Sequence, residues 1–146
     1  MLDLARRATP RIAVLLVAAV AVLSSCVPFN SQEEFLFNKT NQLRRTEGVN
    51  AMGGMDELTE RARVLARGLA ARGRLSHSDL HQMGVRWTAA AENVARSHSI
   101  EDAYQRLAAS PSHRENMANP TYVRTGVGTA RAKDGSVYVV QLFWRG

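Results

Sequence analysis

The apolar residues of this chain change their spacing along the sequence, and this change limits the structures that the chain can form. Between residues 56 and 72 they recur at intervals of 4, 3 and 4, within a stripe of about 60° on a helix, as Leu58, Ala62, Leu65 and Leu69. Residues 122–131 and 136–144 are instead rich in β-branched and aromatic residues, and Lys133-Asp134-Gly135 between them is typical of a hairpin turn. The pattern predicts a helix in the middle of the chain and a two-stranded hairpin at its end.

Three further helical segments are expected from the residues that would start them. A helix capped at Asn30 or Ser31 is predicted to run to about residue 46, before the next glycine. Ser99 is a candidate cap for another helix, and Ser110-Pro111 marks the start of a short one, because proline is tolerated at the first helical position. Residues 74–88 carry no such pattern and are predicted to be irregular.

The N-terminal segment has the organisation of a signal peptide. Arginines precede an apolar stretch, residues 12–23, that is shorter than the roughly 20 residues of a membrane span. The stretch ends in Leu23-Ser24-Ser25-Cys26, which resembles the lipobox of bacterial lipoproteins and predicts lipidation at Cys26; the alternative is ordinary secretion with cleavage near Ser25. We therefore expect an extracytoplasmic protein, anchored or secreted, with a signal peptide at 1–25, a tether at 26–33 and one domain at 34–146.

Cysteine usage and charge exclude some classes of protein. Cys26 is the only cysteine, so no disulfide can form within the chain. The net charge is +6, and four arginines of the middle helix lie off its apolar stripe. We interpret them as a solvated face rather than a nucleic-acid surface, because no aromatic residues that could stack on bases lie between them. These arginines are Arg61, Arg63, Arg67 and Arg72.

Two histidines and a glutamate are the candidate functional residues. Imidazoles and carboxylates bind metals or move protons near neutral pH. His77, Glu92 and His113 lie in the part of the chain whose sequence pattern is least regular. His77 and His113 are the candidate metal ligands, with Glu92 either as a third ligand or as the group that orients one imidazole. The alternative is a hydrogen-bonded cluster that holds loops against the sheet. No catalytic residue is assigned; in an enzyme, Glu92 would be the general base.

Other polar and aromatic residues near these positions have simpler interpretations. Trp87 is the best candidate for contact with a ligand, and we place it with Asn93 in a predicted ligand cleft. Asn93 is also expected to bond to backbone, as buried amides in irregular segments usually do. His81 and His98 are expected at solvated loop positions. None of the serines near His77 or His113 has an identifiable base.

Short motifs along the chain together resemble one known family. Each is weak alone, but their order and spacing are specific, and they cover about residues 34–144. They are Asn41-Gln42-Leu43-Arg44, Leu75-Ser76-His77, Glu92-Asn93-Val94-Ala95, Ser110-Pro111-Ser112-His113-Arg114-Glu115-Asn116-Met117, Asn119-Pro120, Tyr122, Gly126-Val127-Gly128 and Gln141-Leu142-Phe143. The chain resembles bacterial members of the CAP (SCP-like) superfamily of cysteine-rich secretory, antigen 5 and pathogenesis-related 1 proteins.

The resemblance implies an α+β fold, a three-layer α-β-α sandwich with a central antiparallel sheet. It also implies a cleft with a tetrad of two histidines and two glutamates, which binds zinc or another divalent cation in some members. His77 and His113 match the histidines and Glu92 matches one glutamate, whereas the second glutamate has no clear counterpart. Ala91 replaces the usual glycine, and Leu107 stands where many relatives have tryptophan.

Three functional hypotheses remain from the sequence. The first is a lipid-anchored, non-catalytic binding module for a lipid-like or cell-envelope ligand, with no required cofactor. The second is a metal-dependent hydrolase of wall peptide or protein that uses His77, His113 and Glu92. The third is a structural envelope protein that presents its surface to a partner. No nucleic-acid partner is expected, and the sequence leaves the oligomeric state open.

Overall fold

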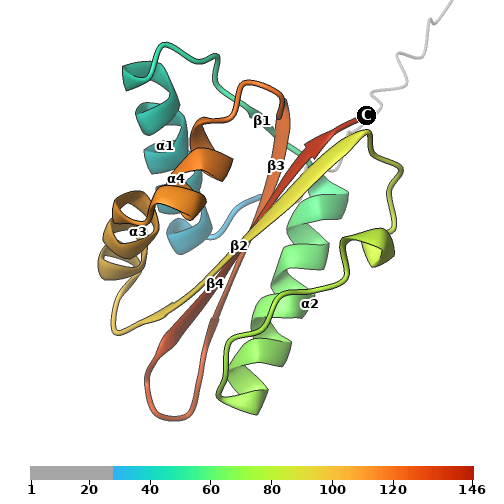
Figure 1. Ribbon diagram of the computed structural model, residues 1–146. Helices are drawn as coiled ribbons and strands as arrows, with labels where there is room; N and C mark the ends of the chain where they lie inside the picture. The colour runs from blue at the N-terminus through green and yellow to red at the C-terminus, as the bar shows by residue number, and fades with distance from the viewer. Residues whose placement is uncertain (1–27) are drawn as a thin grey trace, which may run out of the picture.

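The computed structural model describes residues 28–146, and four helices flank a central four-stranded sheet in this part of the chain. Helices α1, α3 and α4 lie on one face of the sheet and α2 covers the other (Figure 1). The predicted three-layer α-β-α sandwich is therefore confirmed. The predicted signal peptide and the candidate lipidation residue Cys26 lie outside the described residues.

The elements follow one another with short connections. In chain order they are α1 (Ser31–Thr46), β1 (Gly53–Gly54), α2 (Asp56–Arg72), a short 3-10 helix η1 (Leu80–Gln82), β2 (Ala89–Ser97), α3 (Ile100–Ala109), α4 (Pro111–Ala118), β3 (Arg124–Arg131) and β4 (Val137–Arg145). The predicted helices and the C-terminal hairpin are present. Helix α1 begins at Ser31, inside the range predicted as tether. None of the described helices is both long and apolar enough to cross a membrane.

The strand order is β1-β3-β4-β2, and β4 pairs antiparallel with both β2 and β3. The two-residue strand β1 pairs with β3 in parallel, so the sheet is mixed where a purely antiparallel one was expected. The difference is confined to the two residues of β1, because β2 and β3 both pair with β4 in antiparallel register as expected. Strand β2, which carries Glu92, forms the opposite edge of the sheet.

Strand β4 is buried on both faces and separates two hydrophobic cores. Its side chains alternate between the core under α1, α3 and α4 and the core under α2, as expected for a repeat of two residues. Helix α2 packs directly on the backbone of β3, because a Cβ at Gly126 or Gly128 would collide with the backbone of α2. Val137, Val139 and Phe143 face the first core, and Tyr138, Val140 and Leu142 face the second.

Two buried charged groups tie α1 to the rest of the domain. Arg44 is 1% exposed, and its guanidinium donates to the carbonyl oxygens of Asn50, Met117, Asn119 and Tyr122 at 2.7–3.0 Å. Arg63 of α2 donates to both carboxylate oxygens of the fully buried Glu33, at 2.9 and 2.7 Å. The prediction of a solvated face is therefore wrong for Arg63, because α1 brings a buried carboxylate to it.

Caps at the helix starts follow the predicted residues with one difference. The side chain of Asn30 accepts from the backbone N–H groups of Gln32 and Glu33, and Ser99 accepts from the N–H of Asp102. Ser110 occupies the cap position of α4, but its hydroxyl makes no capping bond and lies 3.4 Å from that of Ser112. Proline at the first helical position still fixes where α4 begins.

Candidate functional site

The centre of the candidate site is the side chain of Glu92, which strand β2 holds with only 3% exposure. Its Oε1 lies 2.9 Å from Nδ1 of His77 and accepts from the backbone N–H of Ser78 at 2.8 Å. Its Oε2 accepts from the hydroxyl of Ser78 at 2.6 Å. One buried carboxylate therefore fixes the loop after α2 against the sheet and orients the His77 ring, whose side chain is 63% exposed.

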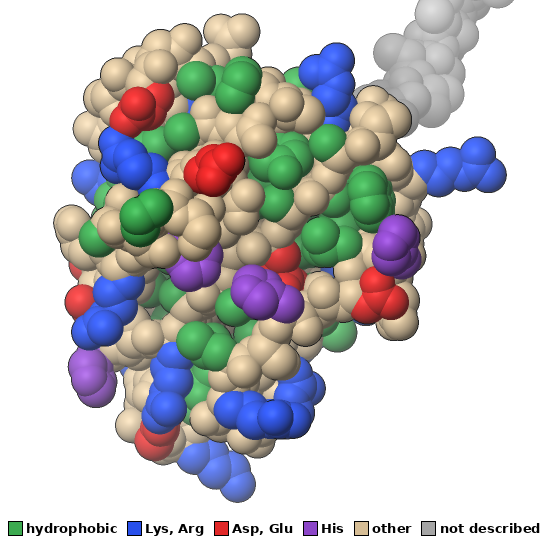
Figure 2. Space-filling model, viewed as in Figure 1, with side chains coloured by type: hydrophobic (Ala, Val, Ile, Leu, Met, Phe, Trp, Pro, Cys, Tyr) green, Lys and Arg blue, Asp and Glu red, His purple; other side chains and the backbone are tan. Residues whose placement is uncertain are grey.

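The second histidine, His113, comes from the first turns of α4 and faces the same side of the molecule. Burial lowers its pKa from the ordinary 6.5, and the nearby charge of His77 lowers it further. Figure 2 shows two histidine side chains close together near the middle of one face, with an acidic side chain beside them. His77 contacts Glu92 and its charge acts on His113, so the three predicted residues lie near one another.

A chain of buried amides lies beneath this cluster and holds α4 in place. Asn93 is fully buried; its amide donates to the carbonyl oxygen of His113 at 3.0 Å, and its side-chain oxygen accepts from Asn116 at 2.9 Å. The same amide lies 3.3 Å from the side-chain oxygen of Gln141, whose own amide donates to Thr40 at 2.9 Å. Asn93 therefore supports the position of His113 from inside the protein, and its side chain is not exposed on a cleft wall.

An apolar pocket opens directly beside His113. Its volume is about 200 Å³, and it lies between β2, α3 and the loop after α2. The rim carries two arginines, each in an ion pair of its own: Arg96 with Asp134 and Arg106 with Asp102, at 2.7 and 2.8 Å. The lining residues are Leu75, Val94, Ala95, Arg96, Arg106, Leu107, Ser110 and His113.

Comparison with protein-family models gives one match, to the cysteine-rich secretory protein family, over residues 37–143. The chain belongs to the CAP family. This range includes all three residues of the His77, Glu92 and His113 cluster. Comparison with curated proteins finds no match.

Solved structures with the same fold come from bacteria and from an animal parasite. An outer surface protein of Borrelia burgdorferi aligns with a TM-score of 0.72 and 19% identity, over 82% of this chain and 96% of that one. An extracellular SCP-domain protein of Bacillus anthracis aligns with a TM-score of 0.68 and 21% identity, over 83% of this chain and 45% of that one. Venom allergen-like protein 4 of Schistosoma mansoni aligns with a TM-score of 0.67 and 12% identity, over 81% of this chain and 90% of that one. At these identities the likeness concerns the CAP fold.

Closed and catalytic zinc sites use three or four protein ligands. The described residues contain no group of three or more His, Cys, Asp or Glu side chains placed to hold an ion, and Glu92 is already engaged by Ser78 and His77. Of the two roles predicted for Glu92, its contact with Nδ1 of His77 matches the orienting one.

The hydrogen bond from the hydroxyl of Ser78 to Glu92 is a contact that the sequence did not reveal. The expectation that no nearby serine has a basic partner is wrong for Ser78, because its hydroxyl bonds to Glu92. The two residues are separated by 14 positions and lie on different elements, so no local pattern connects them. Since Glu92 accepts three hydrogen bonds from Ser78 and His77 together, it fixes the loop after α2 to strand β2.

Trp87 of the CAP domain lies away from the pocket beside His113. Its indole N–H donates to the carbonyl oxygen of Leu80 at 3.2 Å, and its ring centroid lies 5.4 Å from that of His81. The side chain packs against the core under α2. Leu107, by contrast, lines that pocket and is 1% exposed.

Proposed function

We propose that this CAP domain acts outside the cytoplasm as a non-catalytic binding module for a lipid-like or cell-envelope ligand. The observation that carries the proposal is the pocket beside His113. Leu75, Val94, Ala95 and Leu107 give it an apolar lining, and arginines stand at its rim. This combination suits an amphiphile whose apolar end enters the pocket while a polar or anionic group stays at the surface.

The size of the pocket indicates how much of such a ligand it can hold. Sites for drug-sized molecules usually have volumes of about 300–1,000 Å³. The volume here, about 200 Å³, suits one end of an acyl chain or a small ring system rather than a whole lipid. The remainder would lie along the surface beside Leu75, whose side chain is 46% exposed.

An extracytoplasmic location is expected from the predicted signal peptide and agrees with two of the structural relatives, which are an outer surface protein and an extracellular protein. A lipid on Cys26 would hold the domain at a membrane, close to lipid-like ligands. The test is to express the chain and its Cys26→Ser variant in a lipoprotein-processing bacterium. The anchor is supported if the wild type is acylated and found in the membrane fraction while the variant is not acylated. It is contradicted if the two proteins have no acyl group in their measured masses and distribute equally between membrane and soluble fractions.

Native mass spectrometry tests the binding function itself. The full chain, purified and then incubated with phosphatidylglycerol vesicles that contain palmitate, is expected to carry a non-covalent adduct of lipid-like mass. Bare protein before and after incubation would overturn the proposal. The alternative of a metal-dependent hydrolase has less support, because both oxygens of its candidate base, Glu92, already lie within hydrogen-bond distance of His77 or Ser78.

A further inference from the structure

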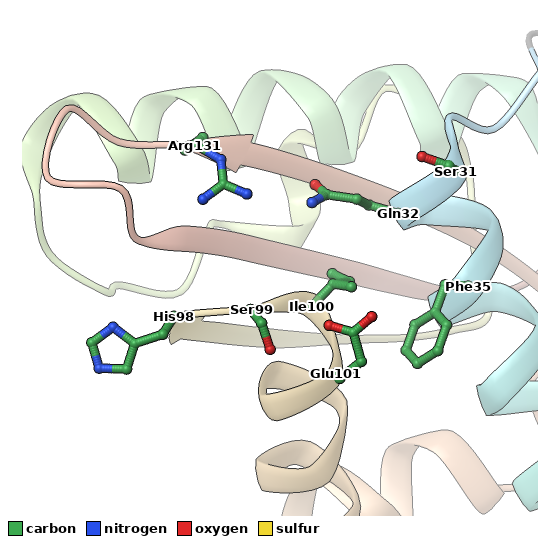
Figure 3. A pocket seen from close by; sticks show the side chains of 8 residues that line it. All are labelled: Ser31, Gln32, Phe35, His98, Ser99, Ile100, Glu101 and Arg131. Atoms are coloured by element: carbon green, nitrogen blue, oxygen red, sulfur yellow. The ribbon is translucent and has the colours of Figure 1, made fainter.

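A second hollow lies apart from the histidine cluster, where the starts of α1 and α3 approach the end of β3. Its volume is about 350 Å³, larger than that of the pocket beside His113 and within the usual range of small-molecule sites. Figure 3 shows Arg131 of β3 and Gln32 of α1 on one side of it, Glu101 of α3 on the other, and Phe35 at one end. The remaining lining residues are Ser31, His98, Ser99 and Ile100, and His98 points away from the others.

The two charges at this hollow have no charged partner in the described part of the chain. None of the ion pairs among residues 28–146 includes Glu101 or Arg131. Arg131 uses one Nη to donate to the carbonyl oxygen of Gly135 at 2.7 Å, which leaves its other N–H donors available. The neighbouring Asp102 and Arg106 differ in this respect, because they pair with each other at 2.8 Å.

The hollow also offers a neutral hydrogen-bonding group and apolar contacts. The side chain of Gln32 accepts and donates no hydrogen bond within residues 28–146, although its backbone N–H is capped by Asn30. The Phe35 ring packs edge-on against Tyr104 with centroids 6.4 Å apart, so its position is fixed. Ile100, the first residue of α3, is 6% exposed. Three elements therefore place a carboxylate, a guanidinium, an amide and an apolar surface around one space.

We propose that this hollow binds a zwitterionic ligand, namely a free amino acid or a short peptide with free termini. The ligand's ammonium group would donate to Glu101, and its carboxylate would accept from the guanidinium of Arg131, which is suited to bidentate bonds with carboxylates. Gln32 can bond to either polar end, or to a peptide group between them. Phe35 and Ile100 would contact the side chain. Opposite charges at one hollow select a ligand that itself carries both charges.

Backbone amide NMR of the full chain tests this proposal with alanine, alanyl-alanine and alanyl-alanyl-alanine as probes. At least one of the three is expected to shift the signals of residues 31–35, 99–101 and 131 in a saturable manner. The N-acetylated and C-amidated forms of that probe each lack one charge, and we expect them to bind at least tenfold more weakly.

Two variants and two matched controls locate the site. Glu101→Gln and Arg131→Gln should each weaken binding of the best probe at least tenfold, whereas Glu57→Gln and Arg124→Gln, at exposed positions away from the hollow, should not. The proposal is overturned if no probe gives a saturable shift. It is also overturned if the blocked probes bind as well as the free one, or if Glu101→Gln and Arg131→Gln leave binding unchanged.

Discussion

Glu92 and His77 are joined by a contact of 2.9 Å between Oε1 and Nδ1, and this contact connects an edge strand to the loop that follows α2. Since the carboxylate is buried and its other bonds come from Ser78, it holds three atoms of that loop at once. The loop contributes Leu75 to the pocket beside His113. The pair therefore fixes one wall of the proposed binding pocket.

Replacing Glu92 should destabilise the domain. A carboxylate that accepts bonds forms stronger ones than a neutral amide, so Glu92→Gln is expected to lower the free energy of unfolding by about 1–2 kcal/mol. Glu92→Ala, which leaves two partly buried donors of Ser78 without an acceptor, should cost more, about 2–3 kcal/mol. Glu47→Gln is the matched control, because its ion pair with Arg114 is exposed and should contribute less than about 1 kcal/mol. Urea denaturation measures all three, and equal losses for Glu92→Gln and Glu47→Gln would contradict the account.

The lowered pKa of His113 makes stability depend on pH. Burial, and then the charge of His77, favour the neutral imidazole in the folded state, so the unfolded chain binds the proton more tightly. The stabilising effect is complete above the unfolded pKa of 6.5 and is lost as the pH falls towards the lower folded pKa. We expect the free energy of unfolding to fall less steeply over this range in His113→Gln than in wild type.

An NMR titration of the histidine ring signals separates the two causes of that shift. In His77→Gln the pKa of His113 should rise, because the nearby positive charge is gone, but it should stay below the ordinary value because burial remains. A pKa of His113 at or above 6.5 in the wild type would show that the cause is wrongly assigned.

The buried pair of Glu33 and Arg63 should matter more for stability than any exposed pair. Hydrogen bonds to Glu33 raise the pKa of Arg63, and the Glu33 side chain has no exposed surface. Arg63→Met would leave this buried carboxylate without its cation, which typically costs about 3–5 kcal/mol. Arg67→Met, at an exposed position on the same helix, should change the free energy of unfolding by less than about 0.5 kcal/mol. Similar losses for the two variants in urea denaturation would contradict the structure.

Zinc should stabilise this domain weakly at most. An ion that binds only the folded state raises the thermal midpoint by mass action, but the described cluster offers two imidazoles and a carboxylate already engaged by the protein. We expect zinc to raise the midpoint of the wild type no more than that of a His77→Ala, His113→Ala double variant. A saturable rise found in the wild type and abolished in the double variant would establish a metal site.

The sequence predicts the elements whose own residues carry the signal. Helix α2 and the β3–β4 hairpin match their predicted ranges closely, because apolar spacing and turn residues are local features. Strand β2 was missed because it contains three consecutive alanines and only one β-branched residue, and it forms by pairing along β4. Strand β1 was missed because two glycines carry no strand signal.

The motifs led to His77, Glu92 and His113, but the sequence described their setting only in part. The expectation of an irregular region is wrong for Glu92, which lies on β2, whereas His113 lies on α4, the short helix expected after Ser110-Pro111. The partners of Arg63 and of Ser78 lie 30 and 14 positions away along the chain. Contacts of this kind depend on how elements pack, which no local pattern reports.

The most direct test of the proposed function compares two exposed apolar residues of similar exposure. Leu75 borders the pocket beside His113 and is 46% exposed, whereas Val64 on α2 is 50% exposed and lies outside that pocket. Transfer of a pyrene-labelled fatty acid from phosphatidylglycerol vesicles to the full chain is measured for Leu75→Asp, Val64→Asp and wild type. The account predicts that Leu75→Asp lowers affinity at least tenfold while Val64→Asp binds as wild type does. Equal uptake by all three proteins, or no uptake by any, would contradict it.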